Sequence, residues 1–142
     1  MNIRAPALGR FGPDHRIRKR AEYRCILAIG ARVTTPHFVF VLALRPPDAA
    51  CHVARLGLVV TKKVGCAVVR NRYKRLAREA FRSWGQGLPG DAEVVVIARP
   101  PRAELSLTDV LGEWDKARAR VQTSLEKLRQ RARSQVPLAK RP

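Results

Sequence analysis

Residues 62–82 read KKVGCAVVRNRYKRLAREAFR and determine most of what this sequence predicts about its fold. The stretch begins where an alternating apolar pattern ends, and Gly65 permits a tight turn there. At 100° per residue, one side of a helix over residues 68–84 is apolar and carries Val69, Tyr73, Leu76, Ala77, Ala80 and Phe81. The sequence therefore predicts a strand, a tight turn and an amphipathic helix in direct succession.

The flanking segments supply the other strands. Residues 37–44 and 52–61 are rich in β-branched and aromatic side chains, and the turn signal at residues 45–48 predicts that they form an antiparallel hairpin. A short strand over residues 33–35 precedes them. Residues 93–98 are nearly all apolar, which predicts a central strand covered on both faces.

Two more helices complete the expected domain. Residues 19–29 have a helical apolar pattern that stops at Gly30, and Ser106 with Asp109 forms a capping box before a final helix. The resulting order is α-β-β-β-α-β-α, a small α+β sandwich over residues 15–128. The strand–helix–strand step around residues 62–82 is a βαβ unit, for which a right-handed crossover is the default expectation.

The two ends of the chain lack this patterning. Residues 1–14 have no apolar periodicity, and we expect a flexible N-terminal arm. Residues 129–142 contain basic residues, no acids and Pro137, which predicts a basic disordered tail.

Composition points to a polyanionic partner. The chain has 142 residues, a formal net charge of +18 and 46% hydrophobic residues, so it combines a real core with a strongly basic surface. Nucleic acid is the first candidate partner and an anionic membrane surface the second. The longest apolar run, residues 38–44, is too short to span a membrane, and no secretory signal is evident. Three cysteines without CxxC spacing favour a reducing, cytoplasmic setting.

The charge within residues 62–82 is unusually one-sided. The stretch holds eight basic residues and one acid, and like charges stand four apart at Arg70, Lys74, Arg78 and Arg82. Each such pair disfavours an isolated helix, so a bound polyanion would explain them better than solvent alone, although a solvated helix face is the alternative. Lys62 and the free N–H groups of the following helix start would form a phosphate-binding corner.

A longer stretch, RLGLVVTKKVGCAVVRNRYKRLAREAFR, resembles the signature of the bacterial ribonuclease P protein subunit, with its RNR motif at Arg70-Asn71-Arg72. The similarity continues in Gly30-Ala31-Arg32, in Phe38-Val39 and in VVIARP at residues 95–100. It covers about residues 15–128.

This resemblance implies a cytoplasmic protein partner of a catalytic RNA. That RNA, with Mg²⁺ that it mainly binds itself, would remove the 5′ leader of precursor tRNA, so the protein would contain no catalytic residue or metal ligand and need no obligate protein partner. The implied fold resembles domain 2 of ribosomal protein S5 and has a left-handed βαβ crossover. The residues implied to bind RNA are Lys62, Lys63, Arg70, Asn71, Arg72, Lys74, Arg75 and Arg78.

The resemblance also implies a cleft for the leader between the first helix and the sheet. Unpaired bases bind to stacking surfaces, and Tyr23 is such a platform. Ordinary core packing is the alternative role for these side chains. Leu27 stands where the family has an aromatic residue, Val41 where it has tyrosine and Cys66 where it has asparagine. The residues implied to line the cleft are Tyr23, Leu27, Val39, Val41, Val59 and Thr61.

Two rival functions remain open at this point. A structural RNA-binding protein of ribosomal type would have a similar basic helix. A protein-only nuclease would need clustered carboxylates to hold metal ions, whereas the acids of this sequence are scattered. The three histidines have no suitably spaced partners, and no phosphate-binding GxxxxGK[ST] loop occurs.

Overall fold

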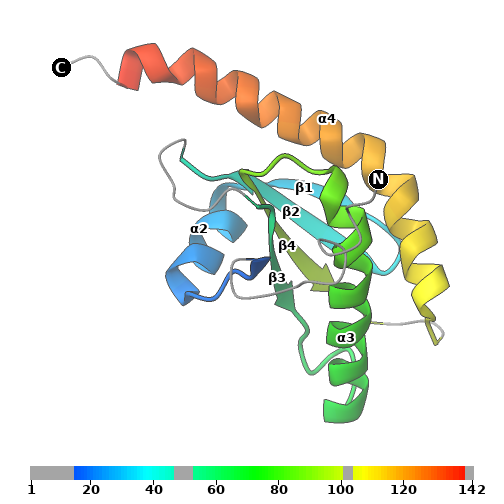
Figure 1. Ribbon diagram of the computed structural model, residues 1–142. Helices are drawn as coiled ribbons and strands as arrows, with labels where there is room; N and C mark the ends of the chain where they lie inside the picture. The colour runs from blue at the N-terminus through cyan, green and yellow to red at the C-terminus, as the bar shows by residue number, and fades with distance from the viewer. Residues whose placement is uncertain (1–14, 47–52, 101–103, 140–142) are drawn as a thin grey trace.

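The computed structural model of the protein describes residues 15–46, 53–100 and 104–139 (Figure 1). Within them the chain forms one four-stranded sheet and three α-helices, which confirms the predicted α+β class and order of elements. The elements are α2 (Arg20–Ile29), β1 (Ala31–Thr34), β2 (Phe38–Leu44), β3 (Arg55–Val59), α3 (Ala67–Trp84), the 3₁₀ turn η2 (Gly85–Gly87), β4 (Ala92–Ala98) and α4 (Leu107–Ala139).

The strand order across the sheet is β1-β2-β4-β3. β4 pairs antiparallel with β2 and parallel with β3, so it is an interior strand, as predicted from its apolar sequence. Val94, Val95 and Val96 are at most 1% exposed, because side chains on both faces of β4 are covered.

The predicted hairpin between residues 37–44 and 52–61 is wrong. β4 lies between β2 and β3, and the observed hairpin joins β1 to β2 with Ala31 opposite Leu42. The turn is closed by Thr35, whose N–H donates to the Phe38 carbonyl and whose hydroxyl accepts the Phe38 N–H. The physical reason is burial of apolar surface. Between β2 and β3, the apolar strand β4 has a partner at each edge and its side chains are covered on both faces, and the short connection between β2 and β3 does not outweigh this.

β3, α3 and β4 form the expected parallel βαβ unit. The turn into α3 is closed by backbone hydrogen bonds from Val64 to Thr61 and from Gly65 to Lys62. Gly65 has φ of +154°, and a Cβ there would stand 3.0 Å from Val69. Glycine therefore permits the tight entry into α3, as predicted.

The sheet has helices on both faces (Figure 1). Alternate side chains of β2 explain this, because Phe38 and Phe40 pack under α3 and α4 whereas Val41 packs under α2. The larger core contains Trp84 and Trp114, whose rings meet edge to face at 5.3 Å. The thinner core under α2 has Ile17, Ile26, Val41 and Val95 as its buried members.

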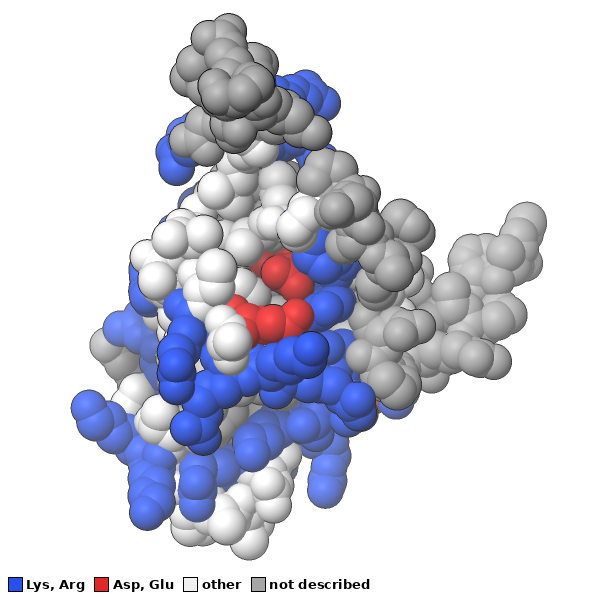
Figure 2. All heavy atoms as spheres, turned by 90° about the vertical axis from the view of Figure 1, so that its left-hand side faces the viewer, with Lys and Arg blue, Asp and Glu red and all other residues white. Residues whose placement is uncertain are grey.

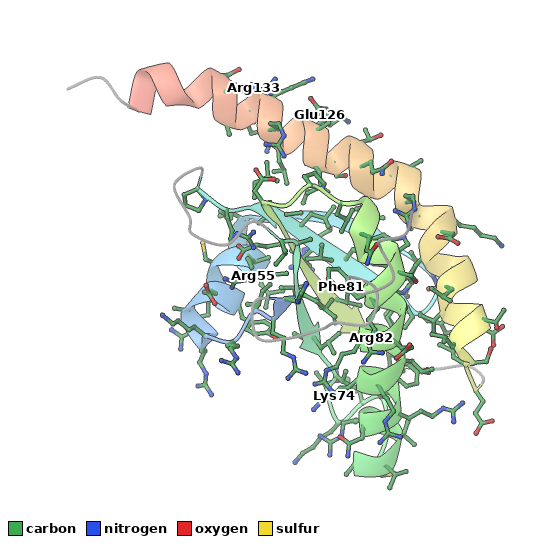
Figure 3. The ribbon with its side chains drawn as sticks, viewed as in Figure 1. Arg55, Lys74, Phe81, Arg82, Glu126 and Arg133 are labelled. Carbon is green, nitrogen blue, oxygen red and sulfur yellow. The ribbon has the colours of Figure 1, made fainter. Side chains whose placement is uncertain are left out.

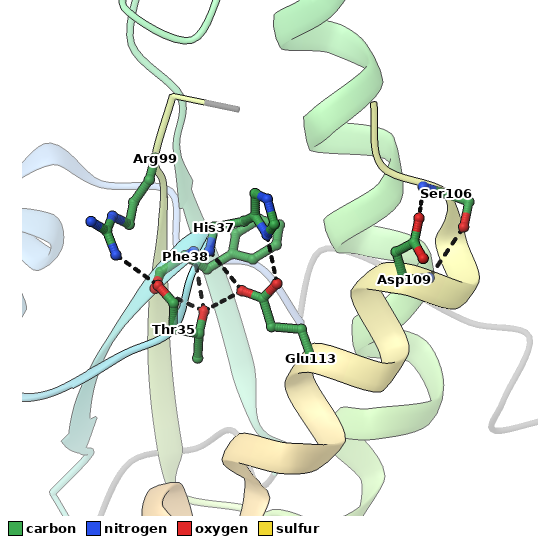
Figure 4. Close-up of polar contacts among 7 residues, drawn as sticks. All are labelled: Thr35, His37, Phe38, Arg99, Ser106, Asp109 and Glu113. Atoms are coloured by element: carbon green, nitrogen blue, oxygen red, sulfur yellow. Dashed lines mark hydrogen bonds and ion pairs between the residues drawn. The ribbon is translucent and has the colours of Figure 1, made fainter. Parts of the chain in front are cut away.

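The start of α4 matches the predicted capping box (Figure 4). The Ser106 N–H donates to the Asp109 carboxylate at 3.0 Å, and the Asp109 N–H donates to the Ser106 hydroxyl at 3.1 Å. One turn later, Glu113 accepts hydrogen bonds from the Thr35 hydroxyl, from the His37 N–H and from His37 Nδ1. Glu113 therefore ties α4 to the β1–β2 turn.

The prediction of a disordered tail from residue 129 is wrong for residues 129–139, which continue α4. Arg129 holds this part of the helix to the loop before β4, with Nη1 and Nη2 at 2.9 and 2.8 Å from the two carboxylate oxygens of Asp91. A bidentate ion pair to a distant loop could not be seen from local composition. The predicted arm at residues 1–14 and the last three residues lie outside the described residues.

No α-helix among the described residues combines the length and the apolar character that a membrane span requires.

We expect Asp91→Asn to lower the free energy of unfolding by about 0.5–1 kcal/mol at neutral pH, because the pair is about one third exposed. The hydrogen bond from Arg129 holds the pKa of Asp91 below its ordinary value of 3.8. The stabilisation is therefore complete above that value and is lost as the pH falls through the folded-state pKa. Urea unfolding of wild type, Asp91→Asn and Arg129→Gln at about pH 7 and about pH 2 measures this. A gap between wild type and Asp91→Asn that stays the same in acid would contradict it.

Candidate nucleic-acid interface

α3 arranges its cations by burying its apolar side. The buried residues Tyr73, Ala77, Ala80, Phe81 and Trp84 fix which way the helix faces. Arg70, Lys74 and Arg78 then follow one another at intervals of four along one flank of the helix, and each is half-buried. We call these three residues the α3 ridge.

The exposed side of α3 continues this charge. Asn71, Arg75 and Arg82 lie next to the α3 ridge by helical spacing and are exposed, and Lys74 projects from the lower half of the helix in Figure 3. Arg82 is paired with Glu79 at 3.2 Å, one turn away. Lys62 and Lys63 are exposed in the turn that leads into α3. The structure thus brings seven of the eight predicted RNA-binding residues to this flank and its approach.

Arg72 is the exception. By helical spacing it points away from the α3 ridge, and its Nη2 donates to the Leu105 carbonyl at 2.8 Å, in the segment before α4. The RNR motif therefore divides: Arg70 and Asn71 stay on the ridge side, while Arg72 fastens α3 to the start of α4. Sequence spacing placed Arg72 on the polar side of the helix but could not identify its partner.

The acids on this side of the molecule are neutralised locally. Arg55 Nη2 lies 2.9 Å from Glu22 and 3.3 Å from Glu93. Burial raises the pKa of Glu93. Burial also opposes ionisation of Glu22, but the hydrogen bond and charge of Arg55 outweigh it, so the pKa of Glu22 is lowered. In Figure 2 the acidic atoms form one small patch, and Lys and Arg side chains cover much of the lower half of the view.

An apolar row crosses the sheet on the face that carries α2. Val39 pairs with Ile97, and Ile97 pairs with Val59, so these three side chains stand side by side on three strands. All three are half-buried. We call them the apolar row. Ile97 was missed from the sequence, because a fully apolar strand gives no sign of which residue stays partly exposed.

Tyr23 and Leu27 of α2 pack beside the apolar row and are themselves half-buried. Tyr23 lies against Gly57, where an added Cβ would stand 2.8 Å from the ring, and its hydroxyl accepts the Leu58 N–H at 3.1 Å. A glycine inside a strand is a signal for such a close approach. Tyr23 therefore has a packing role and also keeps part of its side chain exposed.

The other two predicted cleft residues differ in exposure. Thr61 is exposed just beyond the end of β3. Val41 is 0% exposed beneath α2, so the prediction that it lines an open cleft is wrong. The reason is its position, since Val41 stands opposite the fully buried Val95 and packs beneath the C-terminal part of α2, close to Gly30.

Cys66 is the residue that precedes α3. It is exposed, and the backbone N–H groups of Val69 and Val68 lower the pKa of its thiol. The start of α3 therefore offers N–H donors to a negative group, as the phosphate-corner prediction requires.

The remaining polar cluster links α4, the β1–β2 turn and the end of β4 by hydrogen bonds. Thr35 and His37 each bond to Glu113, and Arg99 Nη1 donates to the Thr35 carbonyl at 2.8 Å (Figure 4). Across residues 15–46, 53–100 and 104–139, no three His, Cys, Asp or Glu side chains come together as a metal site would require.

Comparison with known proteins assigns the chain to a family. The family model described as Ribonuclease P matches residues 11–122. The chain belongs to the ribonuclease P protein family.

Relatives and solved structures agree with this assignment. The chain is 44% identical over 93 residues to the ribonuclease P protein component of Desulfovibrio desulfuricans, covering 65% of this chain and 69% of that protein. It is 36% identical to the component from Shouchella clausii, covering 88% and 91%. The RNase P protein structure from Thermotoga maritima is similar with a TM-score of 0.64 and 27% identity, over 75% of this chain and 96% of that one.

We expect Arg72→Ala to destabilise the fold by about 1 kcal/mol, because it removes the hydrogen bond from α3 to the Leu105 carbonyl. Arg75→Ala is the matched control, since Arg75 is exposed on the same helix, and it should change stability by less than about 0.5 kcal/mol. Thermal or urea unfolding of the two variants compares them. Equal stabilities would mean that the Arg72 contact contributes nothing.

Proposed function

We propose that this chain is the protein component of ribonuclease P, which assists a catalytic RNA in the endonucleolytic removal of the 5′ leader of precursor tRNA in the cytoplasm. One observation carries the proposal: this member of the family has both the basic α3 ridge and the half-buried apolar row, so one chain offers a surface for RNA phosphates and a surface for unpaired bases. A structural RNA-binding protein of ribosomal type would also need the basic helix, but it would not change the cleavage of precursor tRNA at the mature 5′ end.

The RNA partner binds the α3 ridge in this proposal. Phosphates accept hydrogen bonds from Arg and Lys, and their neutralisation removes the repulsion between Arg70, Lys74 and Arg78. Lys62, Lys63 and the first N–H groups of α3 continue the surface toward the turn. Asn71 and Arg75 add contacts, whereas Arg72 acts through its bond to Leu105 and positions α3 against α4.

The leader binds at the apolar row in this proposal. Half-buried Val39, Ile97 and Val59 give unpaired bases a flat apolar surface, and the Tyr23 ring borders it. Leu27 and Thr61 flank the row. This surface is aliphatic apart from Tyr23, which suits leaders of varied sequence because apolar contact does not read base edges.

Chemistry belongs to the RNA and its Mg²⁺ in this proposal. The described carboxylates do not fit a protein-held metal: Asp91, Glu113, Glu22 and Glu93 are each engaged by a cation or by hydrogen-bond donors. The finer fold assignment, a domain like domain 2 of ribosomal protein S5 with a left-handed βαβ crossover, belongs to the same proposal.

Reconstitution tests the proposal directly. We expect the purified chain to leave precursor tRNA intact in the presence of Mg²⁺, because it carries no metal-binding carboxylate cluster among its described residues. Added to the ribonuclease P RNA of the same genome at low Mg²⁺, it should increase cleavage at the mature 5′ end. Gel analysis of labelled precursor measures both. Cleavage by the protein alone, or no effect on the RNA, would overturn the proposal.

The leader surface makes a second prediction. Tyr23→Ala should reduce the preference of the holoenzyme for precursor over mature tRNA by about 1–3 kcal/mol, because a stacking surface is lost. Tyr23→Phe keeps the ring and should keep the preference, although it loses the acceptor for the Leu58 N–H and should melt at a lower temperature. Affinities for the two RNAs and melting curves measure this. An unchanged preference in Tyr23→Ala would remove Tyr23 from the leader site.

A further inference from the structure

A second basic surface lies at the opposite edge of the sheet from β3. β1 and the middle of α4 enclose an open groove of about 380 Å³. Its lining contributes three cations and three hydroxyl groups, from Arg32, Arg120, Lys127, Thr34, Thr123 and Ser124. We call it the β1–α4 groove.

Charge on α4 is divided between the two sides of the helix. Lys116, Arg120, Lys127 and Arg131 fall on the side toward the β1–α4 groove by helical spacing. The two acids on that side are already engaged: Glu113 is bonded to Thr35 and His37, and Asp109 forms the capping box with Ser106.

The acids of the other side have cations beside them. Asp115 lies 3.5 Å from Arg118, and Glu126 shares its side with Arg129 and Arg133. Figure 3 shows Glu126 and Arg133 on the outer side of α4. The groove side of α4 therefore carries a net positive charge, whereas the outer side is mixed.

The groove lining suits a phosphodiester backbone. Guanidinium, ammonium and hydroxyl groups are the side chains that donate to phosphate oxygens. The described lining contains no aromatic ring on which a base could stack. Charge complementarity and this lack of a stacking surface favour backbone contacts with RNA over recognition of bases.

The groove is separate from the α3 ridge. α4 packs on β1 and β2, α3 packs on β3, and β1 and β3 are the two edges of the sheet. Three strand spacings put those edges roughly 14 Å apart. The match to the family model ends at residue 122, before Thr123, Ser124 and Lys127.

We infer that the β1–α4 groove binds the phosphate backbone of RNA, at a segment distinct from the one at the α3 ridge. The inference rests on the proposed function, because it takes the partner to be the ribonuclease P RNA. Two contacts at opposite edges of one sheet would hold the protein in a single orientation on that RNA.

Two matched pairs of variants test the inference. Thr123→Glu places a negative charge in the groove, and Gln122→Glu makes the same change on another side of the same helical turn. Lys127→Gln removes a groove cation, and Arg133→Gln removes a cation from the outer side. The double variant Lys74→Gln/Arg78→Gln tests the α3 ridge. Filter binding of the full-length chain to labelled ribonuclease P RNA, over a series of salt concentrations, gives the affinity and its salt dependence.

We expect Lys127→Gln to weaken binding and to flatten the slope of log affinity against log salt by about 0.7–0.9, the contribution of one phosphate contact. Thr123→Glu should weaken binding more than Gln122→Glu, while Arg133→Gln leaves the slope unchanged. Melting curves verify that each variant is folded.

The outcomes separate the two proposals. If the α3 double variant loses affinity but the groove variants match their controls, the groove does not bind this RNA, and an acidic protein partner or solvent is its neighbour instead. If neither the α3 variant nor the groove variants change binding, the proposed function itself fails.

Discussion

Burial of both faces of β4 is the constraint on which the rest of the structure depends. Val94, Val95 and Val96 project alternately to the two sides of the sheet and are almost completely covered. A strand of this kind needs a neighbour at each edge and a layer on each face. β2 and β3 supply the neighbours, α3 and α4 one layer, and α2 the other. The β1–β2 hairpin and the βαβ unit follow from meeting these needs together.

The two layers are unequal, and this inequality creates the candidate leader surface. Under α3 and α4 the sheet packs against Trp84 and Trp114, which fill a thick aromatic core. α2 has only ten residues and covers part of the other face, where Val41 and Val95 are fully buried. The apolar row near the ends of the strands stays half-buried, because Tyr23 and Leu27 of α2 border it without covering it completely. The surface available to a ligand is thus the part of the sheet that α2 leaves incompletely covered.

The charged side chains also fall into two groups, those that join elements of the fold and those that remain on the surface. Several acids form ion pairs that join different elements of the fold. Asp91 pairs with Arg129, Glu113 with His37, and both Glu22 and Glu93 with Arg55. The cations greatly outnumber these acids, and part of the surplus lies at the two edges of the sheet. The α3 ridge lies at one edge and the β1–α4 groove at the other.

The sequence by itself determined the class and order of elements, the interior position of β4, the amphipathic character of α3 and the capping box of α4. Each of these depends on residue periodicity or on partners within one turn, which a linear pattern records. Only the tertiary structure decided that β4 separates β2 from β3, that Val41 is buried whereas Ile97 is half-exposed, that Arg72 bonds to Leu105, and that α4 continues past Arg129, which is paired with Asp91. These outcomes depend on contacts between residues far apart in the chain, and such contacts form only when the layers close on β4.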